Sequence, residues 1–136
     1  AEYNPFLLDV EFNTIQKDKK LAGYLKKSKC KLMISWHDFK KTPSDSQLRT
    51  KFNKMRKFSD IVKIVTVSKN VSDASRLLSL YSIKSKNKTI AFCMGEQGKF
   101  SRILCLHLGS PFTYVSLGKA IAPGQFSVNE IKSLSY

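Results

Sequence analysis

Long apolar runs are missing from this sequence, and so is the layout of a secretory signal. No stretch approaches the roughly 20 apolar residues that a membrane-spanning helix needs. The first residues include Glu2 and Asp9 and lack the basic-then-apolar order of a signal peptide. We therefore expect a soluble, cytoplasmic protein with no membrane partner.

Cysteine is scarce, with only Cys30, Cys93 and Cys105 present. Their number is odd, and they lack the short paired spacings of a zinc site. We expect three reduced, buried thiols and no bound metal.

Acidic residues are also few, with 10 Asp and Glu against 24 Lys and Arg, which gives a formal net charge of +14. Such an imbalance suggests a nucleic acid, an acidic partner or an anionic small molecule. The basic residues are dispersed along predicted helix faces, however, and no aromatic-basic RNA-binding signature accompanies them. We interpret most of them as solvated surface charge and expect no specific nucleic-acid binding.

What the chain does contain is a regular alternation of apolar and helical segments over 136 residues, the size of one domain. The predicted strands lie at 5–12, 31–36, 60–67, 88–94 and near 111–115. The predicted helices lie at 13–28, from residue 44, from residue 72, at 100–108 and from about residue 127. Apolar strands separated by helices indicate a parallel sheet, so we predict a single α/β domain over residues 1–136.

The number of strands indicates part of a barrel. A closed (β/α)₈ barrel has eight strands and typically uses about 250 residues, whereas about five strands are predicted here. We therefore expect a half barrel of parallel strands with covering helices. In such a sheet, functional side chains gather at the carboxyl ends of the strands.

Lys63 is unusual because it interrupts the apolar run 61–65 in the middle of a strand that should be buried on both faces. It shares one face with Ile61 and Val65, where desolvation favours the neutral amine that a carbonyl nucleophile needs. The alternative is a lysine that extends to solvent or pairs with a carboxylate.

His37 lies at the end of the neighbouring predicted strand, on the face of Met33 and Ser35. It can therefore reach the same end of the sheet as Lys63, and the combination suggests Schiff-base chemistry with proton transfer. The alternative is a hydrogen-bonded histidine at a strand end. His107, among leucines on a predicted helix, is interpreted as structural.

Several motifs occur in the order of one known family. Segment 35–43, SWHDFKKTP, is similar to the S-x-H-D-F-x-x-T-P segment of type I 3-dehydroquinate dehydratases. Segment 62–64, VKI, resembles that family's Schiff-base strand, and 94–102, MGEQGKFSR, resembles its glycine loop and arginine. Segments 109–114, GSPFTY, and 122–125, APGQ, resemble its last strand and loop, and 9–11, DVE, resembles the D-x-E of its fourth strand.

The resemblance implies a lyase of the shikimate pathway that dehydrates 3-dehydroquinate to 3-dehydroshikimate without a metal or organic cofactor. It implies that Lys63 forms the Schiff base and that His37 transfers protons. Arg102 would hold the substrate carboxylate, and Gln125 would close over the substrate from a loop made mobile by Gly124. The candidate pocket walls, each of which could equally be core, are Phe92, Met94 and Tyr114.

Two departures from the family pattern affect these expectations. Ile121 stands where the family's last loop usually has a serine, so one substrate contact is lost. The family's first three strands, with their E-x-R and R-S-x-x-E-G-G elements, have no counterpart in residues 1–136. We therefore expect a homo-oligomer, or a second chain that completes the barrel, and impaired activity of the chain alone. The alternatives are a non-catalytic relative that serves in binding or assembly, and a basic nucleic-acid module.

Overall fold

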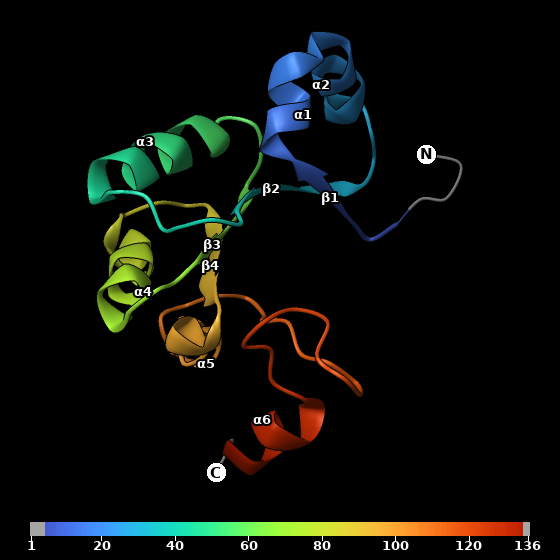
Figure 1. The fold of residues 1–136 in the computed structure, drawn as a ribbon. Coiled ribbons are helices and arrows are strands. Elements are labelled where there is room, and N and C mark those ends of the chain that lie inside the picture. The colour runs from blue at the N-terminus through green and yellow to red at the C-terminus, as the bar shows by residue number, and fades with distance from the viewer. Residues whose placement is uncertain (1–4, 135–136) are drawn as a thin grey trace.

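The computed structural model describes residues 5–134, which form one parallel sheet with helices (Figure 1). The sheet has four strands in the order β1-β2-β3-β4, and each neighbouring pair is parallel. The strands are β1 (Leu7–Glu11), β2 (Lys31–Asp38), β3 (Ile61–Val67) and β4 (Lys88–Met94). The structure thus confirms the α/β class and four of the five predicted strands.

Helices follow each strand, as the alternation predicts. They are α1 (Phe12–Lys17), α2 (Lys19–Lys26), α3 (Asp45–Met55), α4 (Val71–Leu78), α5 (Ser101–His107) and α6 (Val128–Leu134), with short 3₁₀ helices η1 (Ser79–Ser82) and η2 (Glu96–Gly98). Ser44 and Gln47 form a capping box that fixes the start of α3, and the Asn70 side chain accepts the Asp73 N–H to start α4. None of the helices within residues 5–134 is long and apolar enough to cross a membrane.

The single helix predicted over 13–28 is wrong, because the chain forms two short helices there. Asp18 separates them with an extended backbone, φ −120° and ψ 95°. Its carboxylate accepts the N–H groups of Lys20 and Leu21, both at 2.9 Å, and so caps α2. In a continuous helix these two N–H groups would donate to backbone carbonyls of the preceding turn. The Asp18 carboxylate replaces those acceptors and so stabilises the interruption between α1 and α2.

The fifth strand predicted near 111–115 is also wrong. This part of the described chain makes only an isolated bridge, between Ser116 and Ser127. Pro111 has no N–H to donate to a ladder, and Phe112 and Tyr114 instead pack with their rings against the sheet. The segment therefore covers one face of the sheet without extending it.

The two faces of the sheet bury different clusters. One face packs against α1, α3 and α4 through Ile34, Val62, Ile64 and their neighbours, and Figure 1 shows α3 and α4 side by side on that side. The opposite face carries a second cluster, which includes Met33, Val65, Ile90, Phe92 and Met94. Lys63 lies on this second face, because it alternates with Val62 and Ile64 along β3.

Candidate active site

The register of the strands places the predicted catalytic residues on adjacent strands of the second face. Ser35 of β2 pairs with Lys63 of β3, and His37 lies two residues further along β2, opposite Val65. Residues two apart on a strand point to the same face, so His37 and Lys63 share this surface. The shared face predicted from the sequence is confirmed.

Lys63 is buried, with 7% of its surface exposed, and its charge is paired. Its Nζ donates to Asp9 Oδ2 of β1 at 2.9 Å and lies 4.5 Å from the ring centroid of Tyr114. The carboxylate and the ring hold the amine in one position at the centre of the sheet. Pairing with a carboxylate was one of the two alternatives that the sequence left open for this lysine.

His37 is held by a carboxylate as well. Its Nδ1 lies 2.9 Å from Glu11 Oε2, and its ring stacks on Phe39 at a centroid separation of 5.7 Å. With Nδ1 engaged by Glu11, the other ring nitrogen is the one left to exchange a proton. Glu11 Oε1 is buried and has no hydrogen-bond partner among the described residues, so this carboxylate has a further acceptor position.

Asp9 and Glu11 both lie in the motif at 9–11, but the sequence alone predicts no role for them. The structure shows that each one holds a predicted catalytic side chain from the edge strand β1. The signal was their spacing of two residues at the end of a predicted strand, which directs both carboxylates to one face.

Arg102 is a buried cation in the first turn of α5. It is 2% exposed, and its guanidinium carbon lies 4.6 Å from the centroid of Phe92. Its Nε has no hydrogen-bond partner, and no carboxylate of residues 5–134 forms an ion pair with it. Burial lowers the pKa of the guanidinium, because it disfavours the charged form. A bound anion would offset this unfavourable effect of burial. The arrangement suits a carboxylate ligand that binds in the fork of this arginine.

The glycine loop before α5 positions this arginine. Ser101 accepts the Cys93 N–H at 2.7 Å and donates to the Gly98 carbonyl at 2.6 Å. Gly98 has no room for a side chain, because an added Cβ would overlap the Cβ of Cys93. The hydrogen bonds of Ser101 and the close packing of Gly98 therefore hold the loop against the end of β4, and Arg102 follows the loop directly.

Aromatic rings connect the lysine to the arginine across the second face. Phe92 and Tyr114 have centroids 5.8 Å apart, with Tyr114 against Lys63 and Phe92 against Arg102. Met94 ends β4 and is buried in the same cluster. The predicted pocket walls are thus brought together between the two cations.

Gln125 is the predicted site residue that the structure does not bring to the others. Its Oε1 accepts the N–H groups of Ile121 at 2.9 Å and Ala122 at 3.3 Å, so its side chain bonds within its own loop. The loop itself contacts the site edge, since the Gly95 N–H donates to the Pro123 carbonyl at 3.1 Å. Within residues 5–134, no group of His, Cys, Asp and Glu is placed to hold a metal ion.

The parallel half barrel and its lysine–histidine face define a family. Residues 1–136 match the family model of type I 3-dehydroquinase, and the chain therefore belongs to that family.

Individual relatives agree with this assignment. The chain is 42% identical over 130 residues to the 3-dehydroquinate dehydratase of Pyrobaculum aerophilum, and the aligned region covers 94% of this chain and 41% of that protein. It is 37% identical over 134 residues to the corresponding protein of Dehalococcoides mccartyi, covering 96% of this chain and 60% of that protein. The chain thus spans roughly half of the length of these relatives.

Solved structures show the same relation. The type I 3-dehydroquinate dehydratase of Clostridium difficile, solved with covalently modified comenic acid, superposes with a TM-score of 0.81 at 28% identity, over 95% of this chain and 53% of that one. The 3-dehydroquinate dehydratase of Aquifex aeolicus superposes with a TM-score of 0.78 at 32% identity, over 95% of this chain and 58% of that one. The predicted half-barrel fold and the family resemblance are confirmed.

Proposed function

We propose that residues 1–136 act as one unit that carries the lysine–histidine part of a 3-dehydroquinate dehydratase site. The reaction would convert 3-dehydroquinate to 3-dehydroshikimate and water, a step of the shikimate pathway in the cytoplasm. The observation that carries the proposal is the buried Lys63 amine on the face that also presents His37 and Arg102. Membership in the dehydratase family supports it.

The proposed chemistry begins at Lys63. Its neutral amine attacks the substrate ketone, and loss of water gives a protonated imine, which acidifies the neighbouring carbon. Asp9 orients Nζ before the substrate arrives, and the ketone must take over this contact when the imine forms. The proton that the Lys63 ammonium group loses before the attack passes to a base at the site and returns on the hydroxyl group that leaves as water, so the ammonium group and the ketone together give the protonated imine and one water.

His37 is the proposed proton-transfer residue. Its unbound ring nitrogen removes the proton next to the imine carbon and then protonates the departing hydroxyl, so that one water leaves. Glu11 supports both steps, because a carboxylate on Nδ1 fixes the tautomer and stabilises the imidazolium that forms between them. Hydrolysis of the imine returns the product ketone and the free amine.

Arg102 is the proposed partner of the substrate carboxylate. Its unpaired, buried guanidinium would gain a charge-assisted bidentate contact. Phe92, Met94 and Tyr114 would then form the walls between the carboxylate and the imine carbon. Gln125 would reach the substrate only if its loop rearranges, since its amide oxygen is bonded to that loop.

We further propose that the site works as part of a larger assembly. Among residues 5–134, β1 and β4 each pair with a single strand, which leaves one edge of each open. An additional segment, another chain or a second copy of this chain would supply the rest of the relatives' barrel. Sedimentation of the 136-residue chain at micromolar concentration tests the second-copy proposal, and a stable 15.5 kDa monomer would contradict it.

Imine trapping tests the chemistry directly. We expect incubation with 3-dehydroquinate and borohydride to add one substrate-derived mass, located on Lys63 by peptide mapping. Lys63→Ala should abolish the adduct, whereas Lys88→Ala, at an exposed lysine that starts β4, should not. An adduct that survives Lys63→Ala would contradict the site assignment.

His37 has a separate signature. In the assembled enzyme, His37→Ala should still permit trapping on Lys63 but lower turnover by on the order of 10²- to 10⁴-fold. Unchanged turnover in this variant would remove His37 from the mechanism. Absence of any adduct in the wild-type chain would instead favour a non-catalytic relative.

A further inference from the structure

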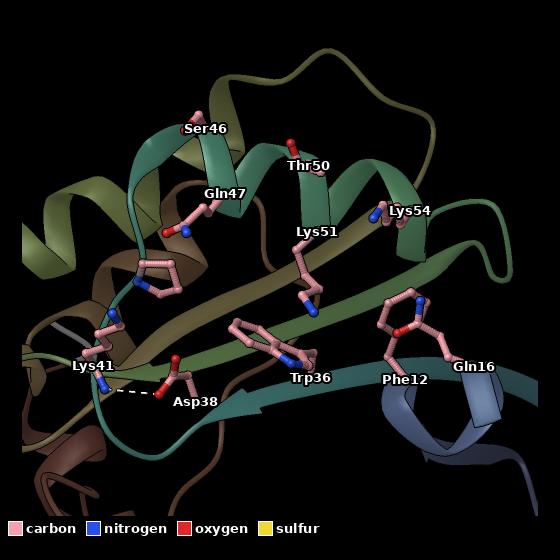
Figure 2. Close-up of a pocket in the computed structure, with 11 residues that line it drawn as sticks. Phe12, Gln16, Trp36, Asp38, Lys41, Ser46, Gln47, Thr50, Lys51 and Lys54 are labelled. Atoms are coloured by element: carbon pink, nitrogen blue, oxygen red, sulfur yellow. Dashed lines mark hydrogen bonds between the residues drawn. The ribbon is translucent and has the colours of Figure 1, made fainter.

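A cavity lies on the helix-covered face of β2, away from Lys63. It has a volume of about 470 Å³ and is lined by residues of α1, β2 and α3 together with the loop that connects β2 to α3 (Figure 2). Trp36 lies at its floor and points away from the face of Ser35 and His37, since side chains alternate along a strand. We refer to this cavity as the Trp36 groove.

Three lysines line the Trp36 groove without a carboxylate partner. Lys41, Lys51 and Lys54 form no ion pair with any residue in the described range 5–134. One carboxylate, that of Asp38, is among the lining groups, and its Oδ1 accepts the backbone N–H of Lys40 at 2.9 Å and of Lys41 at 3.0 Å. The three ammonium groups outnumber the single carboxylate, so the groove carries a net positive charge.

Lys51 is already oriented into the groove. Its Nζ lies 4.5 Å from the Trp36 ring and 5.6 Å from the Phe12 ring, and Figure 2 shows its side chain reaching from α3 towards the strand. A cation held over an aromatic face keeps its three N–H donors available to an anion. The indole offers a flat apolar surface directly beside these donors.

The three lysines and the Trp36 ring indicate which kind of ligand would fit the groove. A single carboxylate would satisfy one ammonium group, whereas a phosphate ester carries close to two negative charges and several acceptor oxygens for a cluster of lysines. A flat ring would gain stacking on Trp36. The volume of about 470 Å³ falls within the range of small-molecule sites.

We propose that the Trp36 groove binds a small phosphate ester that carries an aromatic ring, such as a nucleoside monophosphate. The ring lies against Trp36 and takes the place of the Lys51 ammonium, which moves onto the phosphate. Lys41 and Lys54 provide the remaining positive charge at the two ends of the groove. The site is separate from the proposed dehydratase site, because the two lie on opposite faces of β2.

The sequence provides a local probe, since Trp36 is the single tryptophan. We expect adenosine monophosphate to change the Trp36 emission of the 136-residue chain at physiological salt, in a saturable manner. Calorimetry on the same samples gives the affinity. Adenosine alone and inorganic phosphate alone should each bind at least roughly tenfold more weakly, because each makes only part of the contacts.

Charge-matched variants separate the groove from the general basicity of the chain. Lys51→Gln with Lys54→Gln should weaken binding of adenosine monophosphate by roughly tenfold or more. Lys84→Gln with Lys86→Gln removes the same charge at exposed positions outside the groove and should leave the affinity within about twofold. Lys41→Gln, at an exposed position, provides a second test that does not disturb the contact with Trp36.

Three results would overturn the proposal. The first is an absence of saturable binding at millimolar nucleotide, and the second is an equal loss of affinity in the groove and control variants. The third concerns nucleic acid: a pentaadenylate that binds far more tightly than the mononucleotide, and loses that affinity in the groove variant, would assign the surface to a strand.

Discussion

Ser101→Ala tests how the glycine loop is fastened to the sheet. The Ser101 hydroxyl is fully buried, accepts the Cys93 N–H at 2.7 Å and donates to the Gly98 carbonyl at 2.6 Å. Alanine removes both bonds. A buried N–H without a partner costs about 1–3 kcal/mol, and the carbonyl adds a smaller amount. We expect the free energy of unfolding to fall by about 2–4 kcal/mol.

The assay is guanidinium denaturation of the wild type and the variant, followed by circular dichroism. With an unchanged dependence on denaturant, the shift of the midpoint gives the difference in free energy of unfolding. For a chain of 136 residues, the same change should lower Tm by roughly 6–20 °C. Ser82→Ala is the matched control, because that hydroxyl is exposed and donates only to the nearby Ser79 carbonyl.

A loss below about 0.5 kcal/mol in Ser101→Ala, the level expected of surface substitutions, would mean that the two bonds do not hold the loop. A loss of the same size in Ser82→Ala would show that local helix effects, and not the connection to β4, account for the change. Because Arg102 follows Ser101 directly, the variant should also weaken any binding that depends on the guanidinium.

Two further perturbations follow from the same structure. Gly124→Ala should destabilise by about 1–3 kcal/mol, because the backbone φ is +70° and an added Cβ would lie 2.5 Å from the Gly95 carbonyl oxygen. Faster hydrogen exchange of the Gly95 N–H would report the lost contact, and unchanged exchange would contradict it. The N–H of Lys69 and the guanidinium of Arg76 hold the pKa of Asp73 below its usual value. This stabilisation is present above the unfolded pKa of 3.8 and is lost as the pH falls through the folded pKa. We therefore expect Asp73→Ala to have a free energy of unfolding about 1 kcal/mol below that of the wild type near neutral pH, and the two values to converge in acid. Urea denaturation across this pH range tests this, and a constant difference would refute the assignment.

The two wrong predictions, the single helix over 13–28 and the strand near 111–115, have a common physical cause. The helix expected over 13–28 has suitable periodicity, but the Asp18 side chain competes for the N–H groups of the next turn. The strand expected near 111–115 has suitable composition, but Phe112 and Tyr114 gain more by covering the sheet than by lengthening it. In both places a tertiary or side-chain contact outweighs local propensity.

Local patterns in the sequence correctly predict four strands separated by helices, the parallel sheet and the face that carries Lys63 and His37. These follow from apolar runs, helix caps and the two-residue alternation of strands, which are local properties of the chain. The order of the motifs also predicts the family, which the family model confirms.

The groups that hold the site residues in place become apparent from the folded chain. Asp9 pairs with Lys63 across 54 positions of sequence, and Glu11 pairs with His37 across 26. The Trp36 groove likewise depends on how α3 lies over β2. Such contacts arise from strand register and helix packing, which bring distant residues together. The spacing of Asp9 and Glu11 indicates that they share a face, but not which side chain each carboxylate contacts.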